Sequence, residues 1–188
     1  MAMKIIVASG NAHKIQEIAE ILQGFEFISM REAGYDGDID ENGSTFKENA
    51  YIKAKFIAEK FNMPALADDS GLCVDALGGA PGVYSARYSG GGDRENRQLL
   101  LKNLENAESR TARFKSAVCL CFPDGKVLFG EGACEGRILF EDTGSGGFGY
   151  DPLFFSDDLQ KSFGLATAEE KNSVSHRFRA LKDLKNKF

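Results

Sequence analysis

The stretch RFKSAVCLCFPDGKVLFGEGAC, residues 113–134, decides the fold class of this 188-residue chain. Two runs rich in apolar and aromatic residues, 113–122 and 126–134, flank the turn sequence Pro123-Asp124-Gly125, and this pattern predicts a β-hairpin. Both runs are apolar on each face of the expected strand, as in a sheet that is covered on both sides. The hairpin therefore predicts a central sheet with other elements packed on each face.

Strands and helices alternate along the rest of the chain. Apolar side chains recur at helical spacing in some segments and form short continuous runs in others. By these patterns, strands are predicted at residues 4–8, 25–30, 65–67 and 153–155, and helices at 11–23, 46–61, 93–104 capped by Asp93, and after Ser173 or Ser175. The glycine-rich or acidic segments between them are predicted loops, at 31–44, 78–92 and 144–149. The sequence thus predicts one α/β domain, residues 1–188, with a mixed sheet flanked by helices.

Charge and cysteine usage exclude several classes of protein. The 28 acidic residues exceed the 23 basic ones, and the net charge of -5 argues against broad charge-driven binding to nucleic acid or anionic membranes. No stretch approaches the roughly 18 apolar residues of a membrane span, and the N-terminal residues do not resemble a secretory leader. We therefore expect a cytoplasmic protein. The cysteines form no C-x-x-C pair, so neither a zinc site nor a disulfide framework is expected.

The first candidate site is the turn between the first predicted strand and helix. It reads Ser9-Gly10-Asn11-Ala12-His13-Lys14, where free backbone N–H groups, the helix dipole and the lysine can converge on a phosphate. It is not a Walker A loop, because G-x-x-x-x-G-K-[ST] is absent. Ordinary capping of the helix explains the same residues, and the sequence leaves both interpretations open.

Two adjacent carboxylates follow the strand predicted at 65–67. The segment Asp68-Asp69-Ser70-Gly71 would lie at the edge of a sheet, where α/β proteins commonly bind ligands, and its hard oxygen atoms suit Mg²⁺. Glu41 and Asp40 in the acidic loop can add a further carboxylate. A tight turn explains the two aspartates equally well at this point, and a solvated acidic loop is the favoured explanation of Glu41 and Asp40 taken alone.

A glycine-rich loop and a cluster of cations lie toward the C-terminus. Residues 144–149 match G-x-G-x-x-G, but a predicted strand follows in place of a long helix, so a dinucleotide site is not predicted. Phe148 and Tyr150 can stack on a base or anchor the loop in a core. Lys171, His176 and Arg177 surround a predicted helix start, where the helix dipole disfavours cations; a ligand and plain structural roles remain open.

Six segments together resemble the inosine triphosphate pyrophosphatase family (Ham1/RdgB-like) in order and spacing. They are Ser9-Gly10-Asn11 with Lys14, residues 46–50 with Lys53, 67–72 (ADDSGL), 79–88 (GAPGVYSARY), 146–151 within GGFGYDP, and 175–177. Each is weak alone, but together they span nearly the whole chain. The resemblance implies an ITPase-like α/β fold, in which an elongated central mixed sheet is flanked by helices, with two lobes around a nucleotide cleft. It also implies a homodimer.

The resemblance further implies a reaction and the residues that perform it. ITP, dITP and XTP would be hydrolysed to the monophosphate and pyrophosphate by Mg²⁺-assisted attack of water on the α-phosphorus, which would remove non-canonical purines from the nucleotide pool. Asp69 would be the general base and would hold Mg²⁺ with Glu41. Asp68 would support Asp69, and Ser70 would touch the substrate. The other residues expected on the substrate are Ser9, Gly10, Asn11, Ala12, His13, Lys14 and Lys53 at the triphosphate, and Phe148, Gly149, Tyr150, Asp151, Lys171, His176 and Arg177 around the nucleoside. A donor such as Arg177 would favour the 6-oxo group of hypoxanthine over the 6-amino group of adenine.

Two other functions are considered. A Maf-type nucleotide pyrophosphatase would act on pyrimidine or modified nucleotides, but its expected motifs are poorly matched. A nucleotide-binding module without turnover is disfavoured because the carboxylates and lysines of a catalytic site are all present. One position departs from the resemblance: Phe178 stands where the family usually has glycine, and we expect it to pack with Leu181 and Leu184.

Overall fold

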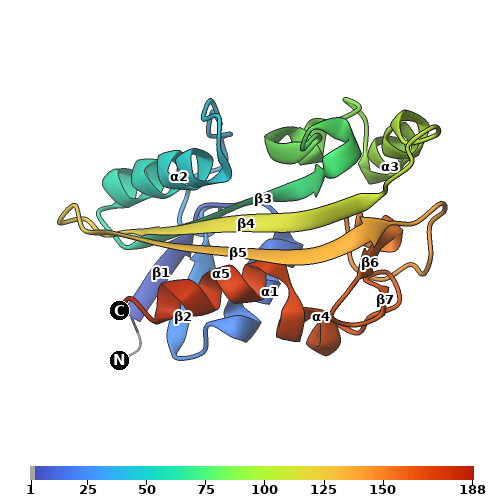
Figure 1. Ribbon diagram of the computed structural model, residues 1–188. Helices are drawn as coiled ribbons and strands as arrows, with labels where there is room; N and C mark the ends of the chain where they lie inside the picture. The colour runs from blue at the N-terminus through green and yellow to red at the C-terminus, as the bar shows by residue number, and fades with distance from the viewer. Residues whose placement is uncertain (1–2) are drawn as a thin grey trace. The chain divides into compact units, whose positions relative to one another are not determined.

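The computed structural model describes residues 3–188, which form a seven-stranded mixed sheet and five α-helices (Figure 1). The strands are β1 Met3–Val7, β2 Phe25–Ser29, β3 Ala65–Val74, β4 Thr111–Cys121, β5 Val127–Ile138, β6 Phe154–Ser156 and β7 Lys161–Ser162. The helices are α1 Ala12–Ile21, α2 Phe46–Phe61, α3 Asp93–Asn103, α4 Ala168–Val174 and α5 His176–Lys185. The strand order is β2-β1-β3-β4-β5-β6-β7; β1 is parallel to β2 and β3, whereas β6 is antiparallel to β5 and β7. The predicted α/β class with a mixed sheet is confirmed.

The chain divides into two compact units. Unit 1 comprises Met1–Asp69, Ser116–Gly132 and Arg177–Phe188, and unit 2 comprises Ser70–Lys115 and Ala133–His176. Each unit has buried hydrophobic clusters of its own. The single domain expected over residues 1–188 stays a prediction. Among the helices of residues 3–188, none is long and apolar enough to cross a membrane.

In unit 1, successive strand residues face two different hydrophobic clusters. Ile5 and Val7 of β1 belong to one cluster and Ile6 to the other, because side chains alternate across a strand. The first cluster also contains residues of α1 and α5, and the second contains residues of α2. Figure 1 shows α2 on one side of these strands and α1 and α5 on the other. Both faces are therefore covered, as the apolar hairpin predicted.

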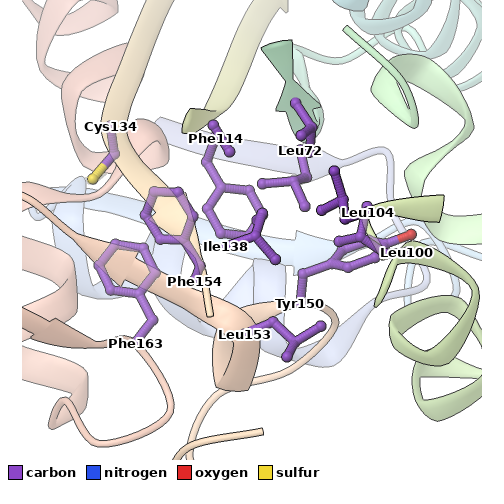
Figure 2. Packing of buried hydrophobic residues seen from close by; sticks show 12 residues of the cluster. Leu72, Leu100, Leu104, Phe114, Cys134, Ile138, Tyr150, Leu153, Phe154 and Phe163 are labelled. Carbon is purple, nitrogen blue, oxygen red and sulfur yellow. The ribbon is translucent and has the colours of Figure 1, made fainter. Parts of the chain in front are cut away.

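Aromatic rings fill the core of unit 2 (Figure 2). The ring of Phe114 lies nearly parallel to that of Phe163, with centroids 6.0 Å apart, and meets Phe154 edge-on at 4.7 Å. Aliphatic side chains complete the cluster, namely Leu72, Leu100, Leu104, Ile138 and Leu153, and Figure 2 shows Leu100 and Leu104 beside the ring of Tyr150. This core supports the glycine-rich loop, since Tyr150 belongs to the same cluster.

Strand β3 is longer than expected. The sequence predicted a strand only at residues 65–67, but β3 continues to Val74, so Asp68 and Asp69 lie inside the strand and not in a turn after its end. The segment reads as a turn because Asp-Asp-Ser-Gly is good turn chemistry. Within a strand, adjacent side chains point to opposite faces, so the two carboxylates meet different partners.

Two helix boundaries also differ from expectation. The cap of α3 is Gly92, whose N–H donates to Glu95, and Asp93 is the first helical residue; its carboxylate accepts a hydrogen bond from Gly149 instead. The helix α4 was not predicted, although its reciprocal capping pair Thr167 and Glu170 is visible in the sequence. Ser173 lies inside α4, and Ser175 separates α4 from α5.

Candidate functional site

Seven charged side chains of unit 1 gather around the middle of β3. They form what we call the β3 charge cluster: Lys14, Glu17, Glu41, Lys53, Asp68, Asp69 and Arg177. They come from α1, the loop before α2, α2 itself, β3 and α5. Buried charges are costly unless they are paired, and here the pairs extend across distant parts of the sequence.

Asp68 lies on the side of β3 that faces α1 and α5. Its Oδ2 atom is 2.8 Å from Lys14 Nζ and 3.1 Å from Arg177 Nη2, and its Oδ1 atom accepts a hydrogen bond from Ser116 Oγ. Although burial favours the neutral acid, Arg177 and Lys14 hold the pKa of Asp68 well below its usual range. Asp68 is therefore a fixed negative charge that orders two cations.

Asp69 lies on the opposite side of β3, facing α2. Lys53 Nζ lies 3.3 Å from Asp69 Oδ1 and 2.6 Å from Glu41 Oε1. Burial raises the pKa of Asp69 above its usual value, and the negative charges of Glu41 and Asp68 raise it further. The positive charges of Lys53 and Lys14 lower this pKa but do not outweigh burial. Neighbouring carboxylates whose pKa values shift in opposite directions are typical of an acid–base site.

The carboxylates around Lys53 fit a divalent cation. Asp69 Oδ2 is buried and has no hydrogen-bond partner among the described residues, which leaves it available to a positive ion. Glu41 is bound to the same ammonium group as Asp69. No group of three or more His, Cys, Asp or Glu residues gathers within residues 3–188 to enclose an ion. One or two carboxylates completed by water and phosphate are the usual protein environment of Mg²⁺.

The turn before α1 is an ordinary helix cap. Asn11 Oδ1 accepts hydrogen bonds from the N–H groups of His13 and Lys14, at 3.0 and 3.3 Å, and Ser9 Oγ accepts one from Asn11. The phosphate interpretation requires free N–H groups at this turn. The N–H groups of His13 and Lys14 are instead bonded to the Asn11 side chain. Gly10, Ala12 and His13 are exposed at this end of α1. Contact of these residues with a triphosphate stays a prediction.

Three predicted base-pocket residues come together in unit 2. Asp151 Oδ2 accepts hydrogen bonds from the Phe148 N–H at 2.9 Å and from Lys171 Nζ at 2.8 Å. The Lys171 ammonium group also lies 4.5 Å from the centre of the Phe148 ring. Asp151 and Lys171 are both buried, so their charges hold each other and the ring in one arrangement.

Two other predicted residues of unit 2 have clear packing roles. Tyr150 is buried, and its hydroxyl donates to the carbonyl oxygen of Ser85 at 2.8 Å. The His176 ring is buried and stacks on Phe114, with centroids 4.8 Å apart. These contacts fit a loop anchor and a structural histidine, and contact of Tyr150 or His176 with the nucleoside stays a prediction. Ser70 follows Asp69 in β3 and is half-buried.

Arg177 was expected at the nucleoside, but its contacts here are carboxylates of unit 1. Its guanidinium group donates to Glu17 and, at 3.1 Å, to Asp68 Oδ2, and the side chain is only 1% exposed. A direct bond from Arg177 to a base stays a prediction. Phe178 is half-buried with Lys182 Nζ 5.9 Å from its ring, so its expected packing with the buried leucines also stays a prediction.

Sequence reasoning missed Glu17 and Ser116. Glu17 lies three residues after Lys14 on α1, so the helical repeat places both on one face, a signal that was available. Ser116 directly precedes the continuous apolar run of residues 117–122 in the hairpin, which also indicated a buried partner.

Comparison with known proteins agrees with this geometry. The Ham1 family model matches residues 5–187. The chain is 47% identical to the dITP/XTP pyrophosphatase of Halalkalibacterium halodurans over 95% of both chains, and 46% identical to that of Haemophilus influenzae over 100% of both. The solved Ham1 protein of Coxiella burnetii matches with a TM-score of 0.89 and 40% identity, covering 98% of this chain and 97% of that one. This chain therefore belongs to the Ham1 family, because it shares the fold, the motifs and the sequence over essentially its full length.

Proposed function

We propose that this chain hydrolyses the non-canonical purine nucleoside triphosphates ITP, dITP and XTP to the nucleoside monophosphate and pyrophosphate. The observation that carries the proposal is the pair Asp68 and Asp69 in β3, whose pKa values shift in opposite directions beside the two lysines of the cluster. Relatives that match over their full length carry the name dITP/XTP pyrophosphatase. The reaction would remove deaminated purines from the nucleotide pool.

Asp69 is assigned the role of general base. It takes the proton from the water that attacks the α-phosphorus, and its raised pKa makes it a better proton acceptor than an exposed aspartate. Lys53 and Lys14 hold phosphate oxygen atoms. Burial lowers the pKa of Lys53, but the negative charges of Asp69 and Glu41 outweigh burial and raise it, so Lys53 stays charged. The choice of the α-phosphorus is an inference from family membership.

Asp69 and Glu41 are the residues assigned to hold a metal ion, which we propose is Mg²⁺. The buried Asp69 Oδ2 atom and the oxygen-only donor set support this assignment. When bound, the ion supplies positive charge that offsets the charge of the phosphates and of the departing pyrophosphate.

The residues of unit 2 are assigned to the base. Phe148 offers a ring face for stacking, and the Lys171 ammonium group beside it is a donor without acceptor capacity. A 6-oxo purine can accept from such a donor, whereas the 6-amino group of adenine cannot. Arg177 is retained as a second proposed donor to the 6-oxo group.

We further propose that the enzyme is a cytoplasmic homodimer that acts on free nucleotides. The family resemblance supports the dimer, and the net charge of -5 disfavours nucleic acid and anionic membranes as partners.

Pyrophosphate release tests the proposal directly. Wild type is assayed with ITP, dITP, XTP, ATP and GTP, with and without Mg²⁺, and compared with Asp69→Asn and Glu41→Gln. The matched control is Asp40→Asn, because Asp40 is an exposed carboxylate next to Glu41. Mg²⁺-dependent turnover that favours the 6-oxo nucleotides and is lost only in the two site variants is expected. Turnover of pyrimidine triphosphates alone would favour a Maf-type enzyme, and binding without turnover would favour a nucleotide-binding module.

A further inference from the structure

Two side chains of α3 hold the backbone of Gly149. Asp93 Oδ2 accepts a hydrogen bond from the Gly149 N–H at 2.9 Å, and Arg97 Nη1 donates one to the Gly149 carbonyl oxygen, also at 2.9 Å. Asp93 and Arg97 are four residues apart, so they project from the same face of the helix, one turn from each other. Both polar groups of a single loop residue are thus bound by one rigid element.

The Arg97 side chain is itself fixed. Its Nε and Nη2 atoms each donate to Asp142 at 2.9 Å, which leaves Nη1 aimed at Gly149. A guanidinium group that donates two hydrogen bonds to one carboxylate is fixed in orientation, because the group is planar and rigid. Because Asp142 is 45% exposed, this ion pair adds little to stability, and its main effect is to orient Arg97.

The residue that is held has an unusual backbone conformation. Gly149 has a φ of +61°, a left-handed conformation that side-chain-bearing residues seldom adopt, and a Cβ atom added there would meet no atom within 4 Å. A side chain would thus find space, and the left-handed backbone itself is what favours glycine here. The flanking residues are fixed by other groups, Phe148 by Asp151 and Tyr150 by Ser85. The two peptide groups of Gly149 connect these anchors, and the one that contains the Gly149 N–H is bonded directly to the Cα of Phe148, so its orientation affects how the Phe148 ring is presented.

We propose that Asp93 and Arg97 are positioning residues that set affinity and selectivity for the nucleobase by fixing the two peptide groups that flank the Gly149 Cα, next to Phe148. This inference rests on the function proposed above, in which Phe148 stacks on a purine. Neither residue is among those assigned to the reacting atoms, which are Asp69, Glu41, Lys14 and Lys53. We call the two hydrogen bonds from Asp93 and Arg97 to Gly149 the clamp. Loss of the clamp should therefore weaken binding of the nucleotide and leave the chemical step unchanged.

The test uses the full-length protein and four variants. Arg97→Ala and Asp93→Ala each remove one hydrogen bond to Gly149. Asp93→Asn is the conservative variant, because its amide oxygen atom can still accept from the Gly149 N–H. Arg94→Ala is the matched control, since Arg94 is an exposed arginine on the same helix. Thermal unfolding of each variant identifies any that fails to fold. Asp93 and Arg97 bind the same residue through two different peptide groups, so the two alanine variants are independent tests.

Two measurements are made on every variant. The first is amide hydrogen exchange at Gly149 without nucleotide, a readout that does not depend on any enzymatic activity. The second is kcat and KM for ITP and ATP. In Arg97→Ala and Asp93→Ala we expect faster exchange at Gly149, a KM for ITP raised by about tenfold, an unchanged kcat and a smaller preference for ITP over ATP. Asp93→Asn should recover most of the KM, and Arg94→Ala should match wild type.

The outcomes separate the clamp from the proposed function. Unchanged exchange at Gly149 in both alanine variants would overturn the clamp. Faster exchange with unchanged KM and selectivity would also overturn the proposal, because the loop would then not control the base. A fall in kcat at constant KM would do so as well. Wild-type protein that turns over no purine triphosphate would overturn the proposed function, and the selectivity role with it, while hydrogen exchange would still report whether Asp93 and Arg97 hold the loop.

Discussion

Units 1 and 2 hold their candidate binding residues in different ways. In unit 1, charged residues far apart in sequence meet at β3; Arg177 and Asp68, for example, are 109 residues apart. In unit 2, Phe148, Asp151 and Lys171 lie within 23 residues of one another, and Lys171 Nζ lies 5.8 Å from the ring centre of Phe163 in the aromatic core. The first arrangement fixes charges, as phosphate chemistry requires, and the second fixes the orientation of a flat ring.

Each unit also pairs a residue assigned to the reaction or the ligand with a residue that holds the structure. Asp69 and Phe148 have the first role, and Asp68 and Tyr150 the second. This distinction would be wrong if a variant of Asp68 or Tyr150 changed only activity, or if a variant of Asp69 or Phe148 changed only stability.

The largest effect is expected for Asp69→Asn. An amide cannot accept the proton of the attacking water, so kcat should fall by about 10²- to 10⁴-fold. The free energy of unfolding should not fall. The pKa of Asp69 is raised in the folded protein, mainly by burial, so its ionisation destabilises the fold as pH rises past the unfolded value of about 3.9. Urea unfolding of variant and wild type from pH 4 to pH 8 checks this, and a wild type that gains stability over the variant as pH rises would contradict it.

Asp68→Ala should reduce stability as well as activity. The change leaves Lys14 without its buried counter-charge and takes one of the two carboxylates described here from Arg177, which keeps Glu17; this costs about 3–5 kcal/mol of unfolding free energy. The pKa of Asp68 is lowered in the folded protein, so its stabilisation is complete above the unfolded pKa and is lost as pH falls through the folded value. The stability gap between wild type and variant should therefore close in acid. Denaturant titrations at pH 7 and below pH 3 measure it, and an equal gap at both would count against the assigned ion pairs.

Phe148→Ala should raise KM for ITP by about tenfold or more, because stacking of a base on an aromatic ring contributes about 1–3 kcal/mol. We expect kcat and the unfolding midpoint to stay close to wild type. Phe140→Ala is the matched control, since Phe140 is an aromatic residue of unit 2 that is 81% exposed. Steady-state kinetics with ITP decide the matter, and equal KM values for the two variants would remove Phe148 from the base pocket.

The smallest effect is expected for Tyr150→Phe. The variant loses one buried hydrogen bond to the Ser85 carbonyl, worth about 0.5–1.5 kcal/mol, but keeps the packed ring. The unfolding free energy should fall by this amount while kcat remains unchanged. A large loss of kcat without loss of stability would show that the Tyr150 hydroxyl takes part in the reaction.

Local sequence patterns predicted most of the fold. The hairpin of β4 and β5 followed from two apolar runs around Pro123-Asp124-Gly125, and α2 followed from its apolar stripe and clear end. These signals lie within a few residues of one another. The length of β3 could not be predicted this way, because its two aspartates are accommodated in a buried strand only by cations from α1, α2 and α5.

The candidate site shows the same limit. The motifs indicated Asp68, Asp69, Lys14 and Lys53 as a group, but not which carboxylate meets which cation. That assignment depends on the alternation of side chains along β3, and therefore on knowing that the segment is a strand. The placement of Arg177 with Glu17, 160 residues apart in the chain, has no local signal at all.

The alternation along β3 also constrains how this gene can change. A one-residue insertion or deletion between Ala65 and Asp68 would exchange the surroundings of both carboxylates at once, turning Asp68 toward α2 and Asp69 toward α1 and α5. Neither aspartate would have been substituted, yet the proton acceptor and the structural anion would have traded places. We therefore expect length variation among descendants of this sequence to accumulate in loops such as residues 31–44 and to spare β3.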